Sequence, residues 1–115
     1  MAASKFRTDH CIAILDHNGV QLDGTNDEIM PLGDIGAKWM AFGWNVIHCD
    51  GHDVAAIEAA VNTAKSVTGR PSIIISETVK GKGVPFMEGK SAWHGKAIGE
   101  EDYRLAKAAL GGVTE

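Results

Sequence analysis

Three short apolar runs constrain the fold of this chain of 115 residues more than any other feature. They occupy residues 11–15, 44–49 and 72–76, and polar or turn-forming residues follow each of them. Short, continuous apolar runs of this kind are typical of parallel strands that are buried on both faces of a sheet. We therefore expect three parallel strands, each covered on both sides.

Helical periodicity fills the intervals between these runs. Apolar side chains recur at spacings of four and three over residues 34–42, and Gly43 follows as a helix stop. A second apolar face, beyond Asp53, is formed by Val54, Ile57, Val61 and Ala64. A last helix is expected over residues 100–110. Strand, helix and strand in alternation predict an α/β fold, a three-layer α/β/α arrangement with a mainly parallel sheet.

Composition excludes several classes of function. The 15 acidic and 11 basic residues are scattered, with a net charge of −4, so the basic stripe of a nucleic-acid-binding surface is missing. No apolar run approaches the roughly 18 residues of a membrane span, which predicts a cytoplasmic protein without a membrane partner. Cys11 and Cys49 each lie in an apolar run, which favours buried free thiols.

The expected sheet is small for a layer that helices must cover on both faces. Residues 1–6 look like the end of a helix that leads into the first strand. We expect residues 1–115 to form a single, partial domain whose missing part lies upstream or comes from another chain. Whether the gene is intact or truncated is left open.

The segment after the first strand carries the first candidate chemistry, because ligands bind beyond the carboxyl ends of strands in open parallel sheets. Asn18 offers an amide oxygen, and Asp16 and Asp23 offer carboxylates. Such hard oxygen ligands suit Mg²⁺ or Ca²⁺. The same residues also suit an ordinary loop with Asx turns, so both interpretations stay open.

Two further segments could bind or react. Lys80 and Lys82 lie among glycines after the third strand, where they could receive phosphate oxygens or simply form a solvated turn. His94 stands beside Gly95, where an imidazole could exchange a proton with a ligand or make a structural hydrogen bond. The remaining histidines, which show no metal-ligand spacing and receive no role, are His10, His17, His48 and His52.

Taken in order, five segments resemble the thiamine-diphosphate-binding domain of transketolase. The resemblance extends over residues 11–98 and is closest to the amino-terminal subunit of bacterial transketolases that are split over two polypeptides. The segments are Asp16-His-Asn-Gly-Val-Gln-Leu-Asp-Gly24, Trp39-Met-Ala-Phe-Gly-Trp-Asn-Val-Ile47, Asp50-Gly-His-Asp53, Thr78-Val-Lys-Gly-Lys-Gly83 and Trp93-His-Gly95.

The resemblance implies a thiamine-diphosphate-binding fold, the cofactor thiamine diphosphate and a divalent ion, Mg²⁺ or Ca²⁺. The ion would be held by the side chain of Asn18 and the carbonyl of Val20. Leu22 would lie against the cofactor, with Lys80 and Gly81 near its diphosphate. His94 would lie near the diphosphate and the reacting end of the substrate, as the catalytic residue for hydrogen bonding or proton transfer. The implied reaction transfers a two-carbon ketol unit between sugar phosphates, as in the pentose phosphate pathway.

Parts of the family pattern are absent. The GDG motif that should precede Asn18, with its metal-binding aspartate, is missing, as are the upstream substrate histidines and the pyrimidine-binding domain. The resemblance therefore implies a homo- or hetero-oligomer such as a dimer, in which the partner is a pyrimidine-binding domain or C-terminal transketolase subunit. The isolated chain is expected to be inactive.

Three other interpretations remain. A related cofactor-dependent enzyme, of the 1-deoxyxylulose-5-phosphate synthase or 2-oxoacid dehydrogenase type, would share the sheet and the asparagine. A non-catalytic remnant would only associate with a partner or do nothing. A nucleotide-binding module is disfavoured, because no GxGxxG follows the first strand.

Overall fold

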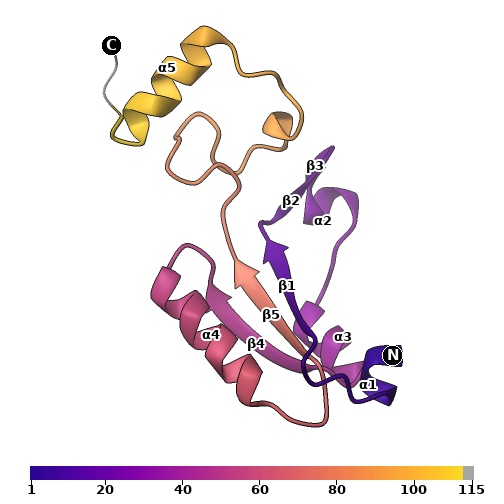
Figure 1. Ribbon diagram of the computed structural model, residues 1–115. Helices are drawn as coiled ribbons and strands as arrows, with labels where there is room; N and C mark the ends of the chain where they lie inside the picture. Colours follow the sequence, from indigo (N-terminus) through magenta and orange to yellow (C-terminus); the bar gives the residue numbers. More distant parts are fainter. Residues whose placement is uncertain (113–115) are drawn as a thin grey trace. The chain divides into compact units, whose positions relative to one another are not determined.

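The computed structural model describes residues 1–112, so residues 113–115, the last of the expected domain, lie outside the described part. The chain divides into two compact units (Figure 1). The first unit combines residues 1–17 with residues 32–78, and the second combines residues 18–31 with the chain from Val79 onward.

A three-stranded parallel sheet forms the centre of the first unit. Its strands β1 (Ile12–His17), β4 (Asn45–Asp50) and β5 (Ser72–Glu77) are arranged in the order β1-β5-β4. Ser72 of β5 aligns with Ile12 of β1 on one side and with Asn45 of β4 on the other. Both pairings are parallel, and both continue along β5 as far as Glu77. The three parallel strands predicted from the apolar runs are confirmed.

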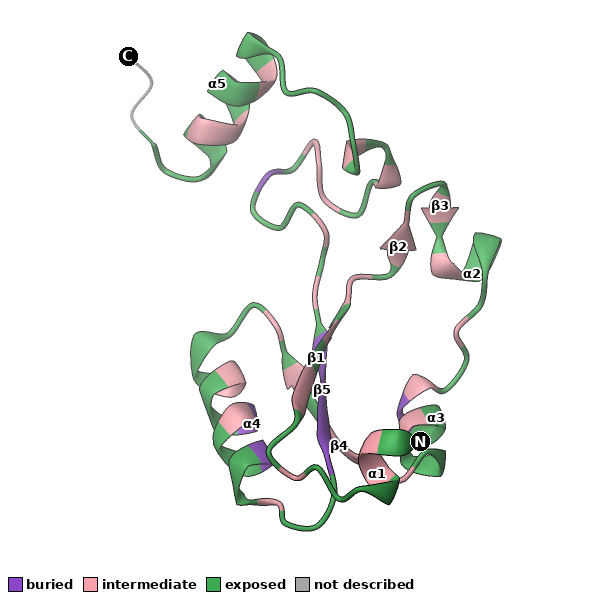
Figure 2. Cartoon of the chain, turned by 45° about the vertical axis from the view of Figure 1, so that its right-hand side comes forward, coloured by how far each residue is buried: buried purple, intermediate pink, exposed green. Residues whose placement is uncertain are grey.

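Helices cover both faces of this sheet (Figure 2). Helix α4 (Val54–Ser66) lies on one face, while α1 (Ala2–Lys5) and α3 (Ile35–Ala41) lie on the other. The two longer helices begin at aspartate caps, where a carboxylate satisfies a backbone N–H that the helix leaves unpaired. Asp53 accepts from the N–H of Ala55 at 2.9 Å, and Asp34 accepts from that of Ala37 at 2.8 Å. The predicted α/β/α layering is confirmed.

Burial in this unit is concentrated on β5 and the inner face of α4. The β5 residues Ile73, Ile74 and Ile75 are at most 1% exposed, and Ala60 and Ala64 of α4 pack against Ile74. β5 is buried because it has a neighbouring strand on each side and helices above and below.

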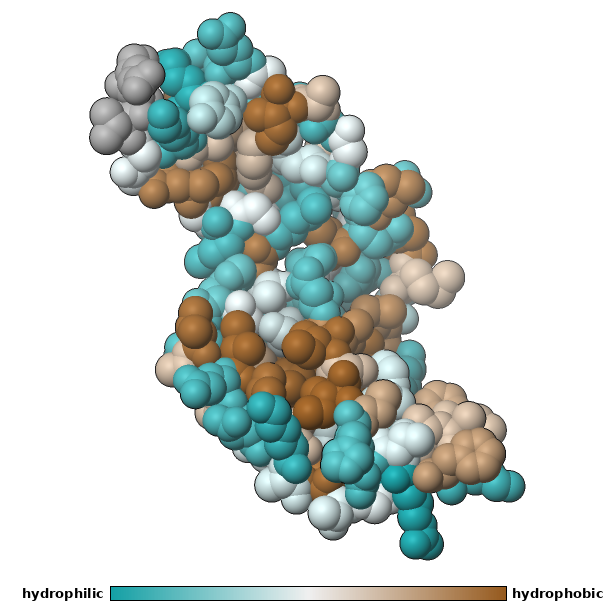
Figure 3. Space-filling model, in the orientation of Figure 1, coloured by the Kyte–Doolittle hydropathy of each residue, from teal (hydrophilic) through white to brown (hydrophobic). Residues whose placement is uncertain are grey.

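The expectation that all three strands are buried on both faces was wrong for β1 and β4. Both are outer strands of the described sheet, and their residues are half-buried or exposed. Ile14 of β1 is 62% exposed, and Figure 3 shows hydrophobic surface over the region of the sheet and α4. Cys11 and Cys49 are free thiols, as predicted, but Cys11 is exposed because it lies just before the outer strand β1.

The second unit contains a small hairpin, a long loop and a helix. Strands β2 (Val20–Gln21) and β3 (Gly24–Thr25) are antiparallel, and α2 (Asn26–Ile29) follows them directly. The hairpin and α2 were not predicted. The signal for α2 was nevertheless present, because Thr25-Asn-Asp-Glu28 is a capping box in which Thr25 and Glu28 bond reciprocally.

The rest of this unit consists of a long loop and the last helix, which was predicted over residues 100–110. The described loop after β5 contains only a short 3-10 helix, η1 (Ser91–Trp93), before α5 (Glu100–Ala109) begins. The left-handed φ of 78° at Gly111 follows the end of α5, as expected for a glycine stop. Val84 is the one buried hydrophobic residue among the described residues of this unit.

None of the helices within residues 1–112 is long and apolar enough to cross a membrane.

Candidate functional site

A cavity of about 220 Å³ lies in the second unit. Its walls bring together five of the six residues to which the family resemblance assigned a binding role, which are Asn18, Val20, Leu22, Lys80 and His94. Gln21 is a further lining residue that the sequence analysis missed. Its position between Val20 and Leu22 could have indicated it, but only if the hairpin that presents these three residues had been predicted.

The hairpin provides one wall of the cavity. Gly19, with φ of 75°, turns the chain into β2, and the turn at Leu22 and Asp23 leads into β3. The side-chain oxygen of Asn18 accepts the N–H of Val20 at 3.1 Å. This bond is the Asx turn that the sequence also favoured, and it orients the Asn18 amide. An amide oxygen has two lone pairs, so accepting this bond does not by itself prevent metal ligation.

The loop after β5 supplies Lys80. Its carbonyl accepts the N–H of Gly89 at 2.9 Å, which closes residues 80–89 into a compact loop. Gly81 is not among the residues that line the cavity, and it has a local structural role. Its φ is 72°, and a Cβ added there would meet the backbone carbon and oxygen of Met87 at 3.0 Å. Glycine is required at this point both for the left-handed conformation and for the close approach of the loop.

His94 is presented by η1. It follows Trp93 with helical dihedrals of −64° and −39°, and its N–H donates to the carbonyl of Ser91 at 2.8 Å. The imidazole is exposed and borders the cavity. β3 contacts η1, so the hairpin and the histidine turn support each other within the same unit.

Thr25 and Glu28 stabilise the hairpin end. The Glu28 carboxylate accepts from the Thr25 hydroxyl at 2.8 Å and from the Thr25 N–H at 3.2 Å. These two hydrogen bonds hold the pKa of Glu28 below its ordinary value, because they stabilise the ionised carboxylate.

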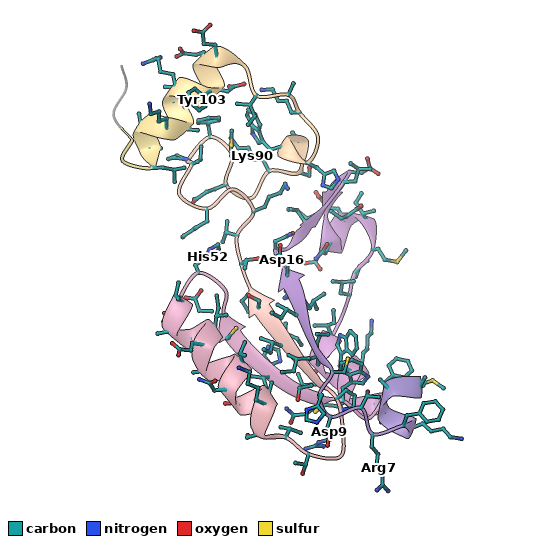
Figure 4. The ribbon with its side chains drawn as sticks, in the orientation of Figure 1. Arg7, Asp9, Asp16, His52, Lys90 and Tyr103 are labelled. Carbon is teal, nitrogen blue, oxygen red and sulfur yellow. The ribbon has the colours of Figure 1, made fainter. Side chains whose placement is uncertain are left out.

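The carboxylates proposed as alternative metal ligands do not line the cavity. Asp16 lies at the end of β1, where it accepts from the hydroxyl of Thr78 (Figure 4). Asp23 lies at the hairpin turn and is exposed. Over residues 1–112, no three or more His, Cys, Asp or Glu side chains are grouped so that they could hold a metal ion.

The cavity suits an anionic ligand with an apolar part. Lys80 contributes a positive charge, His94 an imidazole, and Asn18 and Gln21 amide groups, while no acidic side chain lines the walls. Leu22 is 58% exposed, so its apolar side chain is available for contact with a ligand. The volume is below the range of about 300–1,000 Å³ that is typical of small-molecule pockets, so this cavity would enclose only part of a cofactor.

Nearly the whole chain matches a known protein family. The family model described as "Transketolase, thiamine diphosphate binding domain" matches residues 1–114. The chain belongs to this transketolase family.

Individual transketolases agree with this assignment. The chain is 46% identical over 110 residues to the 6-deoxy-6-sulfo-D-fructose transketolase subunit SqwG of a Clostridium strain, covering 96% of this chain and 40% of the relative. It is 36% identical over 106 residues to one subunit of the apulose-4-phosphate transketolase of Phocaeicola vulgatus, covering 92% of this chain and 38% of the relative. The chain therefore spans about two fifths of the length of these relatives.

A solved transketolase structure confirms the fold. The transketolase from Campylobacter jejuni superposes with a TM-score of 0.88 at 30% sequence identity, covering 96% of this chain and 17% of that one. The α/β fold of transketolases, predicted from the strand and helix pattern, is thereby confirmed.

Proposed function

We propose that this chain forms part of a transketolase that transfers a two-carbon ketol unit between sugar phosphates with thiamine diphosphate as cofactor. The observation that carries the proposal is the cavity in which Asn18, Val20, Leu22, Lys80 and His94 meet. Family membership supports the cofactor, and the relatives named as transketolase subunits support the reaction.

The lining residues suit the parts of thiamine diphosphate. The Lys80 ammonium and the His94 imidazole can bind diphosphate oxygens, and Leu22 can cover an apolar ring. When bound, the cofactor supplies the carbon nucleophile and the electron sink of the reaction. Gly81, through its turn, holds the loop that presents Lys80.

A divalent ion, Mg²⁺ or Ca²⁺, fits the donors at the hairpin. The Asn18 amide oxygen and the Val20 carbonyl are hard oxygen ligands, and diphosphate oxygens would complete part of the ion's shell. A cation on two neutral ligands needs anionic partners, and no carboxylate lines this cavity. We propose that a carboxylate from outside these 115 residues supplies the missing charge.

His94 is the proposed catalytic residue. An imidazole exchanges a proton near neutral pH, and its exposed position at the cavity lets it reach a bound substrate. We propose that it hydrogen-bonds the reacting end of the sugar phosphate and moves a proton there.

A partner is part of the proposal. The small cavity encloses only part of a cofactor, and two similar relatives are named as subunits. We propose that a pyrimidine-binding domain or C-terminal transketolase subunit completes the site in a homo- or hetero-oligomer. Both compact units would act as one cofactor-binding domain, since a single family model extends over residues 1–114.

Calorimetric titration with thiamine diphosphate and Mg²⁺ tests the proposal. We expect binding when a candidate C-terminal subunit is present and none with the chain alone. Lys80→Met should weaken binding about tenfold, the loss of one charge-assisted contact. Lys82→Met is the matched control, because Lys82 is exposed and does not line the cavity. Absence of binding with every partner would overturn the proposal and favour a non-catalytic remnant.

Turnover assays separate the related enzymes. Ketol transfer between a ketose phosphate and an aldose phosphate is expected in the complex, whereas turnover of pyruvate or another 2-oxoacid would indicate a related cofactor-dependent enzyme. His94→Gln should reduce kcat more than cofactor affinity, because the residue is proposed to act at the substrate. Ketol transfer by the chain without a partner would contradict the expected dependence on a second subunit.

A further inference from the structure

We infer that Trp93 is a positioning residue that sets where the His94 imidazole stands in the cavity. The inference rests on the proposed function, since His94 is the residue proposed to act on the substrate. The Trp93 side chain does not line the cavity itself and acts through its neighbour, His94.

The Trp93 indole is attached to the loop of residues 80–89 by two contacts. Its ring meets Phe86 edge-on, with centroids 5.4 Å apart and planes at 67°. Its Nε1–H donates to the carbonyl of Phe86 at 3.2 Å. An aromatic pair alone allows the indole to slide, whereas the hydrogen bond also selects one orientation of the ring.

A cation also contacts the indole. The Lys96 ammonium lies 3.9 Å from the centroid of the Trp93 ring, and it also pairs with the Asp102 carboxylate at 3.5 Å. Lys96 therefore connects the indole to the first turn of α5. We refer to Phe86, Trp93 and Lys96 together as the aromatic clasp.

The clasp determines the geometry of the catalytic turn. Trp93 is the last residue of η1 and His94 comes next, with its N–H bonded to the Ser91 carbonyl. A turn of three residues has little internal freedom, so anchoring the indole also fixes the direction in which residue 94 leaves the turn.

The same contacts couple two of the polar residues of the cavity wall, Lys80 and His94. Phe86 lies in the loop that Lys80 and Gly89 close through their backbones, and Lys90 follows this loop directly before η1 (Figure 4). The Phe86–Trp93 contact thus joins the loop that carries Lys80 to the turn that carries His94. A displacement of about 1 Å in a positioned group can reduce turnover as much as 100-fold, so this coupling matters for catalysis.

A role as simple hydrophobic filler would predict different behaviour. A filler needs only volume, so Trp93→Phe would preserve it, and the Nε1–H bond and the Lys96 contact would be unimportant. A positioning role predicts graded loss from Trp93→Phe, which keeps a ring but lacks the donor, to Trp93→Leu, which lacks both. Trp44→Phe is the matched control, because Trp44 is also half-buried and stacks edge-on against Trp39 at 4.8 Å in the first unit.

The direct test uses the 115-residue chain with ¹³C-labelled histidine, followed by NMR. The His94 ring signal is assigned by its loss in His94→Gln. Trp93→Leu should shift the His94 ring signal while leaving the signals of the other four histidines in place. Trp93→Phe should shift it less, and Trp44→Phe should leave it unchanged. An unmoved His94 signal in Trp93→Leu, or equal shifts of all five histidines, would overturn the inference.

A rescue experiment and an activity assay complete the test. Lys96→Met should also shift the His94 signal, and Lys96→Arg should restore it, because arginine keeps both the ring contact and the pair with Asp102. If Trp93→Leu fails to fold by far-UV circular dichroism, Trp93→Phe decides the outcome.

In the complex with a C-terminal subunit, Trp93→Leu should lower kcat about tenfold and cofactor affinity less. A wild-type complex without ketol transfer would overturn the proposed function, whereas the His94 signal would still decide the positioning role.

Discussion

The two compact units of this transketolase-family chain are stabilised by different means. The first unit buries a central strand of three isoleucines between helices on both faces of a parallel sheet. The second unit, over its described residues, buries one hydrophobic side chain, Val84, and is otherwise organised by turns, short hydrogen-bonded segments and the aromatic clasp.

The first unit therefore contains most of the buried apolar core, whereas the second unit contains the cavity. Burial of apolar surface gives most of the free energy of folding but little directional control over polar groups. Local hydrogen bonds and a glycine turn orient polar groups but contribute little to the free energy of folding. The cavity lies in the unit where such local contacts predominate. We expect the second unit to open locally more easily than the first, which is common for ligand-binding loops.

The largest expected effect comes from the core of the first unit. Ile74→Ala removes a side chain that is 1% exposed and packs against Ala60 and Ala64, so we expect a loss of about 2–5 kcal/mol of unfolding free energy. Urea unfolding followed by circular dichroism measures it. Ile14→Ala, at a site 62% exposed, is the control and should cost far less. Equal losses would show that β1 is buried in solution.

A backbone change in the second unit should act locally. Gly81→Ala meets both a left-handed φ of 72° and the Met87 backbone, so we expect a cost of about 1–3 kcal/mol and a loosened loop. Hydrogen exchange over residues 80–90 should accelerate while exchange in β5 does not. Gly89→Ala has the unfavourable φ of 65° but open space, so its effect should be smaller. Acceleration throughout β5 would mean that the units unfold together.

Removal of a helix cap should have a smaller effect on stability, and the effect should differ between the two units. Asp53→Ala removes the cap of α4, which covers the buried sheet, and should lower the unfolding free energy by about 1 kcal/mol. Thr25→Ala removes the cap of the four-residue α2 and should leave urea unfolding almost unchanged. Faster amide exchange limited to residues 25–29 would measure its effect. A large global loss from Thr25→Ala would contradict the separation.

The smallest expected effect is a pH dependence at the hairpin. Two hydrogen bonds from Thr25 hold the pKa of Glu28 below its ordinary value, so the ionised carboxylate stabilises the folded capping box. This stabilisation is present above the ordinary pKa of a glutamate and is lost as the pH falls through the lower pKa of the folded state. NMR titration of the Thr25 amide should show the loss, and Glu28→Gln should abolish it. An unchanged titration in that variant would exclude Glu28 as the titrating group.

Much of the fold could be predicted because local patterns encode it. The isoleucine run of β5, the apolar face of α4 and the acidic start of α5 each carry a signal within a few residues. The hairpin was missed because strands of two residues are too short to show a periodicity. Helix α2 was missed although its capping box was legible in the sequence.

The site was predicted unevenly for a related reason. Asn18, Val20, Leu22, Lys80 and His94 were found through their order along the chain, and the structure brings all five to one cavity. Gly81, predicted as a cofactor contact, is not among the residues that line the cavity, and a Cβ added there would meet the Met87 backbone. Gln21 carries no signal of its own. The metal and cofactor roles of these residues stay predictions.

The sequence by itself determined the three parallel strands, the longer helices between and after them, and the family, because these depend on residue types at short spacings and on motifs in order along the chain. Only the tertiary structure decided that β1 and β4 are half-exposed, since burial depends on which strands and helices lie alongside. It also decided that Lys80, His94 and the hairpin share one cavity and that Trp93 contacts both Phe86 and Lys96. Contacts between residues far apart in the chain arise from packing, which no local pattern encodes.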